Sequence, residues 1–126
     1  MTPSAKICEI IYCMVCQLPP LDKWKLPNTA QIEFICLDEL YVDDAKTVSA
    51  YATYMFNEET ELHEICINKS KNYTYDALLG SILHETIHMK RFKTKHWAEH
   101  DRVFKSYANR YASYTAYPKL DFNLAI

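Results

Sequence analysis

The sequence predicts an α+β protein of one domain, with a helix, a small three-stranded sheet and two further helices in chain order. At 126 residues, of which 49% are hydrophobic and 24% charged, the chain can bury one core and has the composition of a globular domain. Its single glycine argues against a loop-rich sandwich and favours helices with a few strands. Apolar residues recur with helical spacing near both ends and alternate in the middle.

Residues 1–30 are predicted to form an N-terminal helix and a connector. Thr2 suits an N-cap and Pro3 suits the first helical position. Pro19 and Pro20 stop the helix, because proline lacks the N–H that a helix interior needs. Apolar residues follow helical spacing between these points: Ile7, Ile10, Ile11, Met14, Val15 and Leu18.

Residues 31–68 are predicted to form the sheet. Ile32, Phe34 and Cys36 alternate and indicate a strand over residues 31–36. Residues 37–46 form an acidic loop. A second strand is predicted over 48–56, which is rich in Tyr, Thr and Val, and a third over 62–68. The short turn between these two strands predicts a hairpin.

Residues 74–114 are predicted to form the two helices of a metal site. Thr74, with Asp76 behind it, is a favourable start for the first helix. His84 and His88 share one side of this helix with the small residues Ala77, Gly80 and Ser81. A final helix is predicted from about Trp97 to about Tyr114.

The segment His84-Glu85-Thr86-Ile87-His88 fits the pattern His-Glu-x-x-His. Residues at i and i+4 share a helix face, so both imidazoles can bind one Zn²⁺ ion. Glu85 lies one step round the helix, where it can reach water at the metal. The pattern predicts a zinc hydrolase, in particular a protease. A chance match in a metal-free fold is the alternative.

A catalytic zinc needs a third protein ligand, and the sequence offers His96, Glu99 and His100. A continuous helix would place His96 roughly 18 Å along the axis from His84. Glu99 should point away from the stripe that His100 shares with Phe104. A turn near residues 92–95 would bring His100 back to the first two ligands, so His100 is favoured.

Residues 65–110 resemble the SprT-like (Spartan-type) zinc metalloprotease domain, with a broader likeness over about 30–112. The matching segments are Ile65 to Asn68, Leu78 to His88, and His100 to Lys105, where the family usually has His-Gly-x-x-Phe-Lys. Asp101 replaces the usual Gly. The zinc ribbon that follows the protease domain in bacterial SprT has no counterpart, because no Cys follows Cys66.

The resemblance implies a zincin-like fold and zinc-dependent proteolysis. It implies that His84, His88 and His100 bind Zn²⁺ and that Glu85 is the catalytic residue. It also implies protein substrates on or near DNA. A zinc-binding domain that contacts DNA or protein without hydrolysis is the alternative function.

A basic segment near the motif is the candidate for DNA contact. Lys90, Arg91, Lys93 and Lys95 surround Phe92, and bases can stack on aromatic rings between cations. A solvated connector is the alternative. Elsewhere the charge is reversed, since residues 33–64 carry nine acids against one Lys. We expect a protein substrate, and the sequence does not predict an oligomeric state.

The five cysteines, an odd set, predict free thiols in a reducing compartment. The apolar run over residues 7–16 contains Glu9 and has no small-residue cleavage site, so no signal peptide is expected. It is also too short to span a bilayer. These features predict a cytoplasmic protein, in a host or bacterial cell interior, with no membrane partner.

Overall fold

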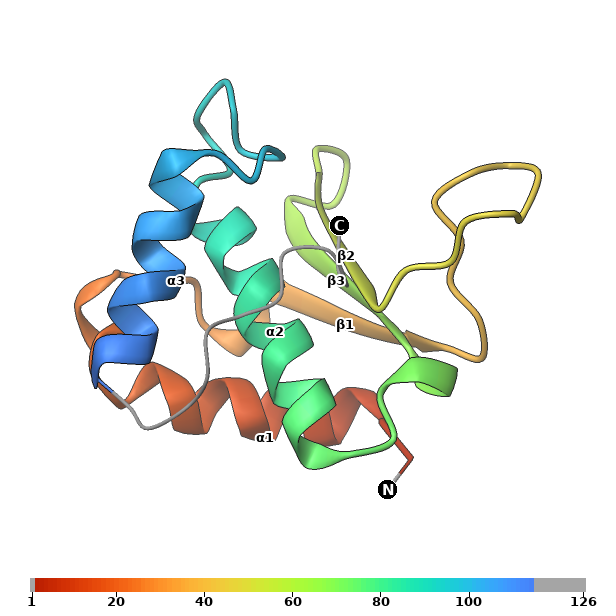
Figure 1. Cartoon of the computed structure of the whole chain (residues 1–126), viewed down its shortest axis with the longest axis horizontal. Coiled ribbons are helices and arrows are strands. Elements are labelled where there is room, and N and C mark those ends of the chain that lie inside the picture. Colours follow the sequence, from red (N-terminus) through yellow and green to blue (C-terminus); the bar gives the residue numbers. More distant parts are fainter. Residues whose placement is uncertain (1, 115–126) are drawn as a thin grey trace.

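The computed structural model describes the backbone of residues 2–114 and the side chains of residues 2–111. Three α-helices and one three-stranded mixed sheet make up the described fold, which confirms the α+β class (Figure 1). The α-helices and strands are α1 (Ala5–Cys16), β1 (Ile32–Leu37), β2 (Ala52–Asn57), β3 (Leu62–Asn68), α2 (Tyr75–Lys90) and α3 (Arg102–Tyr114). Short 3₁₀ turns cover Leu21–Lys23, Thr29–Gln31 and Lys69–Lys71.

The sheet has the order β1-β3-β2, so β3 is central. β2 pairs with β3 in antiparallel fashion, which confirms the predicted hairpin, and β1 pairs with β3 in parallel. The second strand begins at Ala52 rather than at Val48. The residues just before β2 pair instead with the preceding loop. The Ala50 N–H donates to the Leu40 carbonyl, and the Val42 N–H donates to the Val48 carbonyl.

One face of the sheet is covered by helices. α1 packs on β1, and α2 packs on β2 and β3. The buried strand residues alternate with more exposed ones, as expected for a sheet with one face against a core. Those on the helix side include Ile32, Phe34, Ala52, Tyr54, Ile65 and Ile67.

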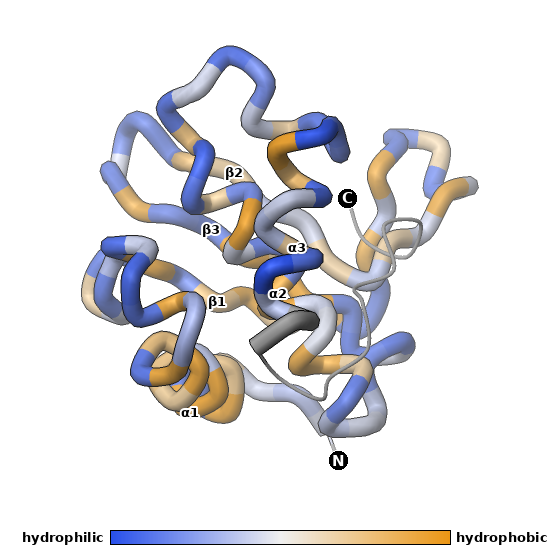
Figure 2. The backbone as a smooth tube through the Cα atoms, turned by 60° about the vertical axis from the view of Figure 1, so that its left-hand side comes forward, coloured by the Kyte–Doolittle hydropathy of each residue, from blue (hydrophilic) through white to orange (hydrophobic). Residues whose placement is uncertain are grey.

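α1 buries only part of the stripe that the apolar pattern indicated. Ser4, not Thr2, is the N-cap, since its hydroxyl accepts from the Ile7 N–H. The helix packs through Cys8, Ile11, Tyr12 and Val15, whereas Ile10, Met14 and Leu18 are exposed. Figure 2 shows this helix as mostly apolar around its whole coil, so spacing alone did not identify the buried side.

Two buried asparagines attach α2 to the sheet. The Asn68 amide donates to the Ala50 carbonyl, and the Asn72 amide donates to the carbonyls of Tyr51 and Asn68. The Asn72 side-chain oxygen accepts from the Ser81 hydroxyl at 2.7 Å. Because buried polar groups are costly unless paired, this network holds the turn after β3 and the start of α2 in one arrangement.

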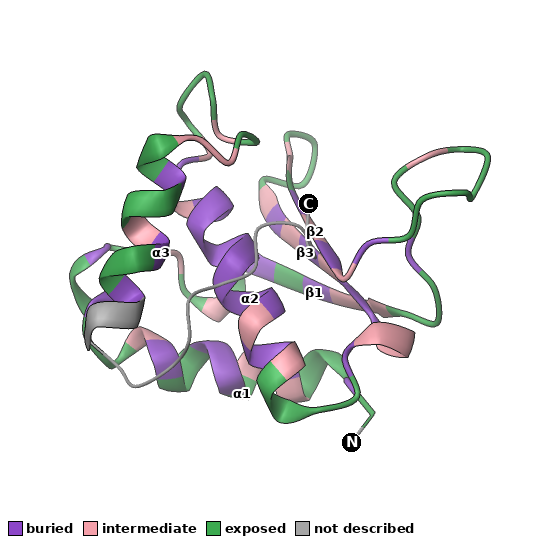
Figure 3. Ribbon diagram, in the orientation of Figure 1, coloured by how far each residue is buried: buried purple, intermediate pink, exposed green. Residues whose placement is uncertain are grey.

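α2 starts where the sequence predicted, since the Thr74 hydroxyl accepts from the Ala77 N–H at 3.1 Å. Asp76 in the first turn favours the same start through the helix dipole. From Leu78 to Met89 every residue except Gly80 is buried, and most of α2 has the buried colour in Figure 3. The histidine side of α2 is therefore covered rather than open to solvent.

α3 starts at Arg102, five residues later than the predicted start at Trp97. The cause is Asp101, whose carboxylate accepts from the Phe104 N–H at 3.0 Å and caps the helix. Residues 91–101 form a loop of turns instead, seen above α2 in Figure 1. Phe104, Ala108 and Tyr111 are the buried residues of α3.

None of the described helices has both the length and the apolar character that a membrane span requires.

Replacing Gly80 by Ala should stabilise the protein. A methyl group at this position meets no described atom within 4 Å, and glycine in a helix interior costs about 0.5–1 kcal/mol relative to alanine. We expect Gly80→Ala to raise the free energy of unfolding by that amount in urea titrations. The matched change Ala77→Gly in the same helix should lower it. A loss of stability in Gly80→Ala would contradict the open space.

Candidate metal centre

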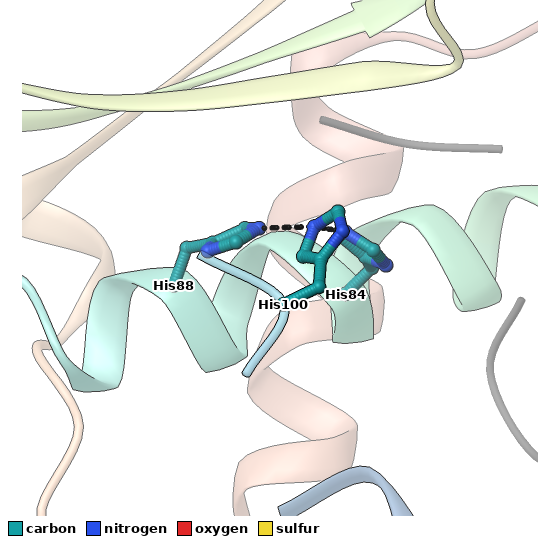
Figure 4. A group of neighbouring side chains, drawn as sticks. All are labelled: His84, His88 and His100. Atoms are coloured by element: carbon teal, nitrogen blue, oxygen red, sulfur yellow. Dashed lines mark hydrogen bonds between the residues drawn. The ribbon is translucent and has the colours of Figure 1, made fainter. Parts of the chain in front are cut away.

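Three histidines from two parts of the chain converge on one point. His84 and His88 lie one turn apart on α2, and His100 comes from the loop residue two before α3 (Figure 4). The Nε2 atom of His100 lies 3.0 Å from Nε2 of His84 and 3.1 Å from Nε2 of His88. Their nearest ligand atoms all lie within 4.8 Å of one another, so the three residues can bind one metal ion.

Hydrogen bonds between the three imidazoles do not by themselves account for the arrangement of their nitrogens. His88 Nδ1 lies 2.7 Å from the Trp97 carbonyl oxygen, which can only accept, so Nδ1 carries the proton and Nε2 presents a lone pair. His100 Nε2 then faces two neighbouring ring nitrogens but can donate to only one of them. A cation at the meeting point satisfies all three lone pairs at once.

The spacing fits a tetrahedral ion. Zinc holds imidazole nitrogens at 2.0–2.1 Å, which places two ligands of a tetrahedron about 3.3 Å apart. The separations of His100 Nε2 from the Nε2 atoms of His84 and His88 are slightly shorter than this value. Three imidazoles leave one tetrahedral position for water or substrate. The metal's identity follows from the donor set only as a preference, because imidazole also suits copper, iron and nickel.

Burial keeps the two helical histidines neutral. His84 and His88 are each 1% exposed, and burial lowers the pKa of His84 to about 3 and that of His88 to about 4. The neighbouring imidazoles contribute to both pKa shifts in the same direction. Burial also lowers the pKa of His100. At neutral pH the site therefore offers uncharged imidazoles, the form that binds metals.

Phe104 forms one wall of the site. Its ring centre lies 4.8 Å from the ring centre of each of the three histidines, and its side chain is fully buried. Because the ring has no donor or acceptor, it cannot compete for the imidazole nitrogens. It restricts the directions that the three rings can take.

Glu85 is buried beside these ligands with no polar partner. Its side chain is 0% exposed, and neither carboxylate oxygen has a hydrogen-bond partner in the described part of the chain. Burial raises the pKa of Glu85 well above its usual range. A buried carboxyl group without a partner costs stability and is uncommon in a purely structural role.

The other two candidates for third ligand lie elsewhere. His96 and Glu99 pair with each other, and both side chains are more than half exposed. The structure thus brings His100, and neither His96 nor Glu99, to His84 and His88.

An ion pair holds the residues on both sides of His100. Arg91, at the end of α2, is only 6% exposed and donates to the Glu99 carbonyl at 3.1 Å and to the Asp101 carboxylate at 2.9 Å. Asp101 also caps α3, and the Arg91 guanidinium lowers the pKa of its carboxyl group to about 2. We name this arrangement the Arg91–Asp101 brace. The brace holds Glu99 and Asp101 against the end of α2 and so positions His100, which lies between them.

Two features of the site were missed from the sequence. The Trp97 carbonyl that orients His88 is a backbone group and leaves no signal in the residue pattern. The Arg91–Asp101 brace did leave a signal in the sequence, because an Asp just before an amphipathic helix is a typical N-cap. The basic segment also differs from expectation, because Arg91 is in the brace and Lys90 donates to the Trp24 carbonyl at 2.6 Å. Lys93 and Lys95 remain exposed.

Asp101→Asn should weaken metal binding while leaving the helix cap in place. Asparagine can still accept from the Phe104 N–H, but it loses the charge that holds Arg91. We expect the dissociation constant of the bound metal ion to rise roughly tenfold or more, as for other groups that orient metal ligands. A competitive chelator titration measures this. Glu99→Gln is the control, because it changes a side chain one residue before His100 and leaves the backbone carbonyl that Arg91 contacts. Equal affinity in Asp101→Asn and the parent would refute the role of the brace.

In the metal-free protein, Glu85 should lower the free energy of unfolding by an amount that grows as the pH rises. The raised pKa means that the folded state keeps a proton which the unfolded state releases above pH 4.5, so stability falls as pH rises through this window. Glutamine does not titrate. We expect the stability of Glu85→Gln relative to the parent to grow by up to about 1.4 kcal/mol per pH unit above pH 4.5.

Urea unfolding in a chelator measures this difference, and the histidine titrations cancel because both proteins share them. Glu59→Gln, at an exposed position, should show no such trend. A stability difference between Glu85→Gln and the parent that does not change between pH 4 and pH 8 would contradict the burial of an unpaired carboxyl group.

Comparison with known proteins finds no match to this chain: no protein-family model, no curated protein and no solved structure matches it.

Proposed function

We propose that this protein is a zinc-dependent peptide hydrolase with a zincin-like fold, similar to the SprT-like metalloproteases. The observation that carries the proposal is the convergence of three imidazoles together with a buried, unpartnered carboxyl group on the residue that follows His84. The three ligands would be His84, His88 and His100, and Glu85 would be the general base.

In the proposed reaction the protein residues hold the reactants and move one proton. A zinc ion in this site supplies a Lewis acid, which acidifies water and polarises a carbonyl oxygen. Glu85 accepts the proton of the attacking water and passes it to the leaving amine. Its raised pKa suits both steps, because the group can hold the proton between them near neutral pH. Phe104 and the buried face of α2 keep other water away from the ligands.

Two features favour hydrolysis over a purely structural metal site. Structural zinc sites are closed by four protein ligands, whereas three side chains meet here among the described residues. A structural site also has no use for Glu85, whose burial without a partner costs stability. The alternative, a zinc-binding interaction domain without hydrolysis, would keep the metal and lack cleavage.

An association with DNA is the weaker part of the proposal. Of the four basic residues in segment 90–95, two are bound within the fold, so contact with phosphates would rest on Lys93 and Lys95. A cytoplasmic location agrees with the five free thiols.

Substitution of the metal ligands and substitution of Glu85 should have different effects on metal content and on hydrolytic activity. We expect one zinc per chain by elemental analysis, and its loss in His84→Ala, His88→Ala and His100→Ala. Glu85→Gln should keep the zinc but cleave fluorescein-labelled casein at least about a hundredfold more slowly, the usual contribution of a general base. Reactions with and without single-stranded DNA test whether DNA stimulates cleavage.

His96→Ala is the matched control for the third ligand, because it removes a nearby exposed imidazole that pairs only with Glu99. It should keep both zinc and activity. Zinc binding without cleavage of any protein would favour the interaction domain. Cleavage by Glu85→Gln at the parent rate would disprove the mechanism.

A further inference from the structure

A pocket lined by aromatic side chains lies beside the metal centre. It has a volume of about 440 Å³. Its lining includes Tyr54 and Phe56 from β2, Phe92 and Trp97 from the loop over 91–101, and the exposed Glu58 and Lys93. We call it the aromatic pocket. Its size falls in the range of about 300–1,000 Å³ that is usual for ligand sites.

The aromatic pocket shares a residue with the support of the metal site. The Trp97 carbonyl accepts from His88 Nδ1, and the Trp97 ring centre lies 6.4 Å from that of His88. The Trp97 ring also packs edge-on against Tyr54 at 5.5 Å. The aromatic pocket and the support of His88 therefore share Trp97, and this shared residue is the structural link between the pocket and the candidate metal centre.

The walls of the pocket are held in place by contacts behind them. Phe56 and Phe92 pack at 5.0 Å between ring centres, and His63 contacts both rings. The Tyr54 hydroxyl is hydrogen-bonded to His63 Nδ1 at 2.7 Å. The pocket is thus formed before any ligand enters, which reduces the entropy lost on binding.

The charges around the pocket favour a polypeptide over a nucleic acid. Glu58 and Lys93 offset each other, and the nearby Lys90 and Arg91 are bound to the Trp24 carbonyl and to Asp101. Binding of nucleic acid depends on several cations that neutralise phosphates, and the lining contributes one. β2 also lies at the edge of the sheet, so its outer backbone groups can pair with an extended chain.

We propose that the aromatic pocket receives a large apolar or aromatic side chain of an extended polypeptide substrate. This specificity rests on the proposed peptide hydrolysis, but binding in the pocket requires neither metal nor cleavage. Edge-to-face and offset contacts with the four rings would favour a phenyl or indole group over a small side chain.

Nuclear magnetic resonance of the indole groups tests the pocket directly. The chain has two tryptophans, so a ¹⁵N-labelled Glu85→Gln protein gives two indole N–H signals. Trp97 reports on the pocket, and the buried Trp24, which packs on Tyr107, serves as the reference for an intact fold. The probes are the blocked pentapeptides Ala-Ala-Phe-Ala-Ala and Ala-Ala-Ala-Ala-Ala, and the oligonucleotide (dT)₅.

We expect the Phe peptide to shift the Trp97 signal saturably and to bind roughly tenfold or more tightly than the Ala peptide, because its ring leaves water. Phe56→Ala should remove this preference. Tyr41→Ala, which removes an exposed aromatic ring from the distant loop before β2, should retain it. If Phe56→Ala also moves the Trp24 signal, Phe92→Ala is the second variant for the same comparison.

Equal binding of the two peptides overturns the proposal, as does a tenfold preference that survives Phe56→Ala and Phe92→Ala. A Trp97 shift with (dT)₅ and none with the Phe peptide also overturns it, in favour of a nucleic-acid site. Zinc-dependent cleavage of casein without the Phe preference would reject the pocket alone. The Phe preference without zinc or cleavage would reject the proposed hydrolysis alone.

Discussion

The close approach of three imidazole nitrogens constrains most of the structure around them. Neutral rings that direct lone pairs at one point repel one another unless a cation lies between them, so the fold must hold them together until one binds. The sheet contributes by fixing α2 through Asn68 and Asn72, and with it the positions of His84 and His88. The remaining ligand depends on how the chain returns after α2.

The chain returns to α2 through the loop over residues 91–101, whose two ends are joined by an ion pair. The Arg91–Asp101 brace joins the end of α2 to the start of α3, so one guanidinium holds residues on both sides of His100. The same loop supplies the Trp97 carbonyl to His88 and the Trp97 ring to the aromatic pocket. The proposed metal binding and the proposed substrate selection would therefore be coupled through eleven residues, 91–101, and a change in this loop should affect both.

Local patterns predicted the parts of the site that lie on α2, and tertiary contacts determined the rest. The start of α2 at Thr74 and the shared face of His84 and His88 follow from helix capping and spacing. The hairpin of β2 and β3 follows from two strands separated by a short turn. The position of His100 needed a reversal of the chain, which the spacing of ligands favoured but did not require.

Other features depended on contacts that the local pattern does not determine. The parallel pairing of β1 with β3 depends on which strands meet in space. The buried side of α1 depends on its contact with β1, because apolar residues lie on both the buried and the exposed sides of that helix. The late start of α3 arises from the competition between helical propensity over residues 97–101 and the Asp101 cap with its ion pair to Arg91. Each of these outcomes is decided by partners distant in the sequence.

X-ray absorption spectroscopy at the zinc edge tests the central claim most directly, since it reports the atoms bound to the metal whatever the substrate is. The account predicts three imidazole nitrogens and one further light atom, oxygen or nitrogen, at about 2.0–2.1 Å, with one imidazole lost in His100→Ala. A sulfur shell at about 2.3 Å, or an imidazole count unchanged by His100→Ala, would contradict it.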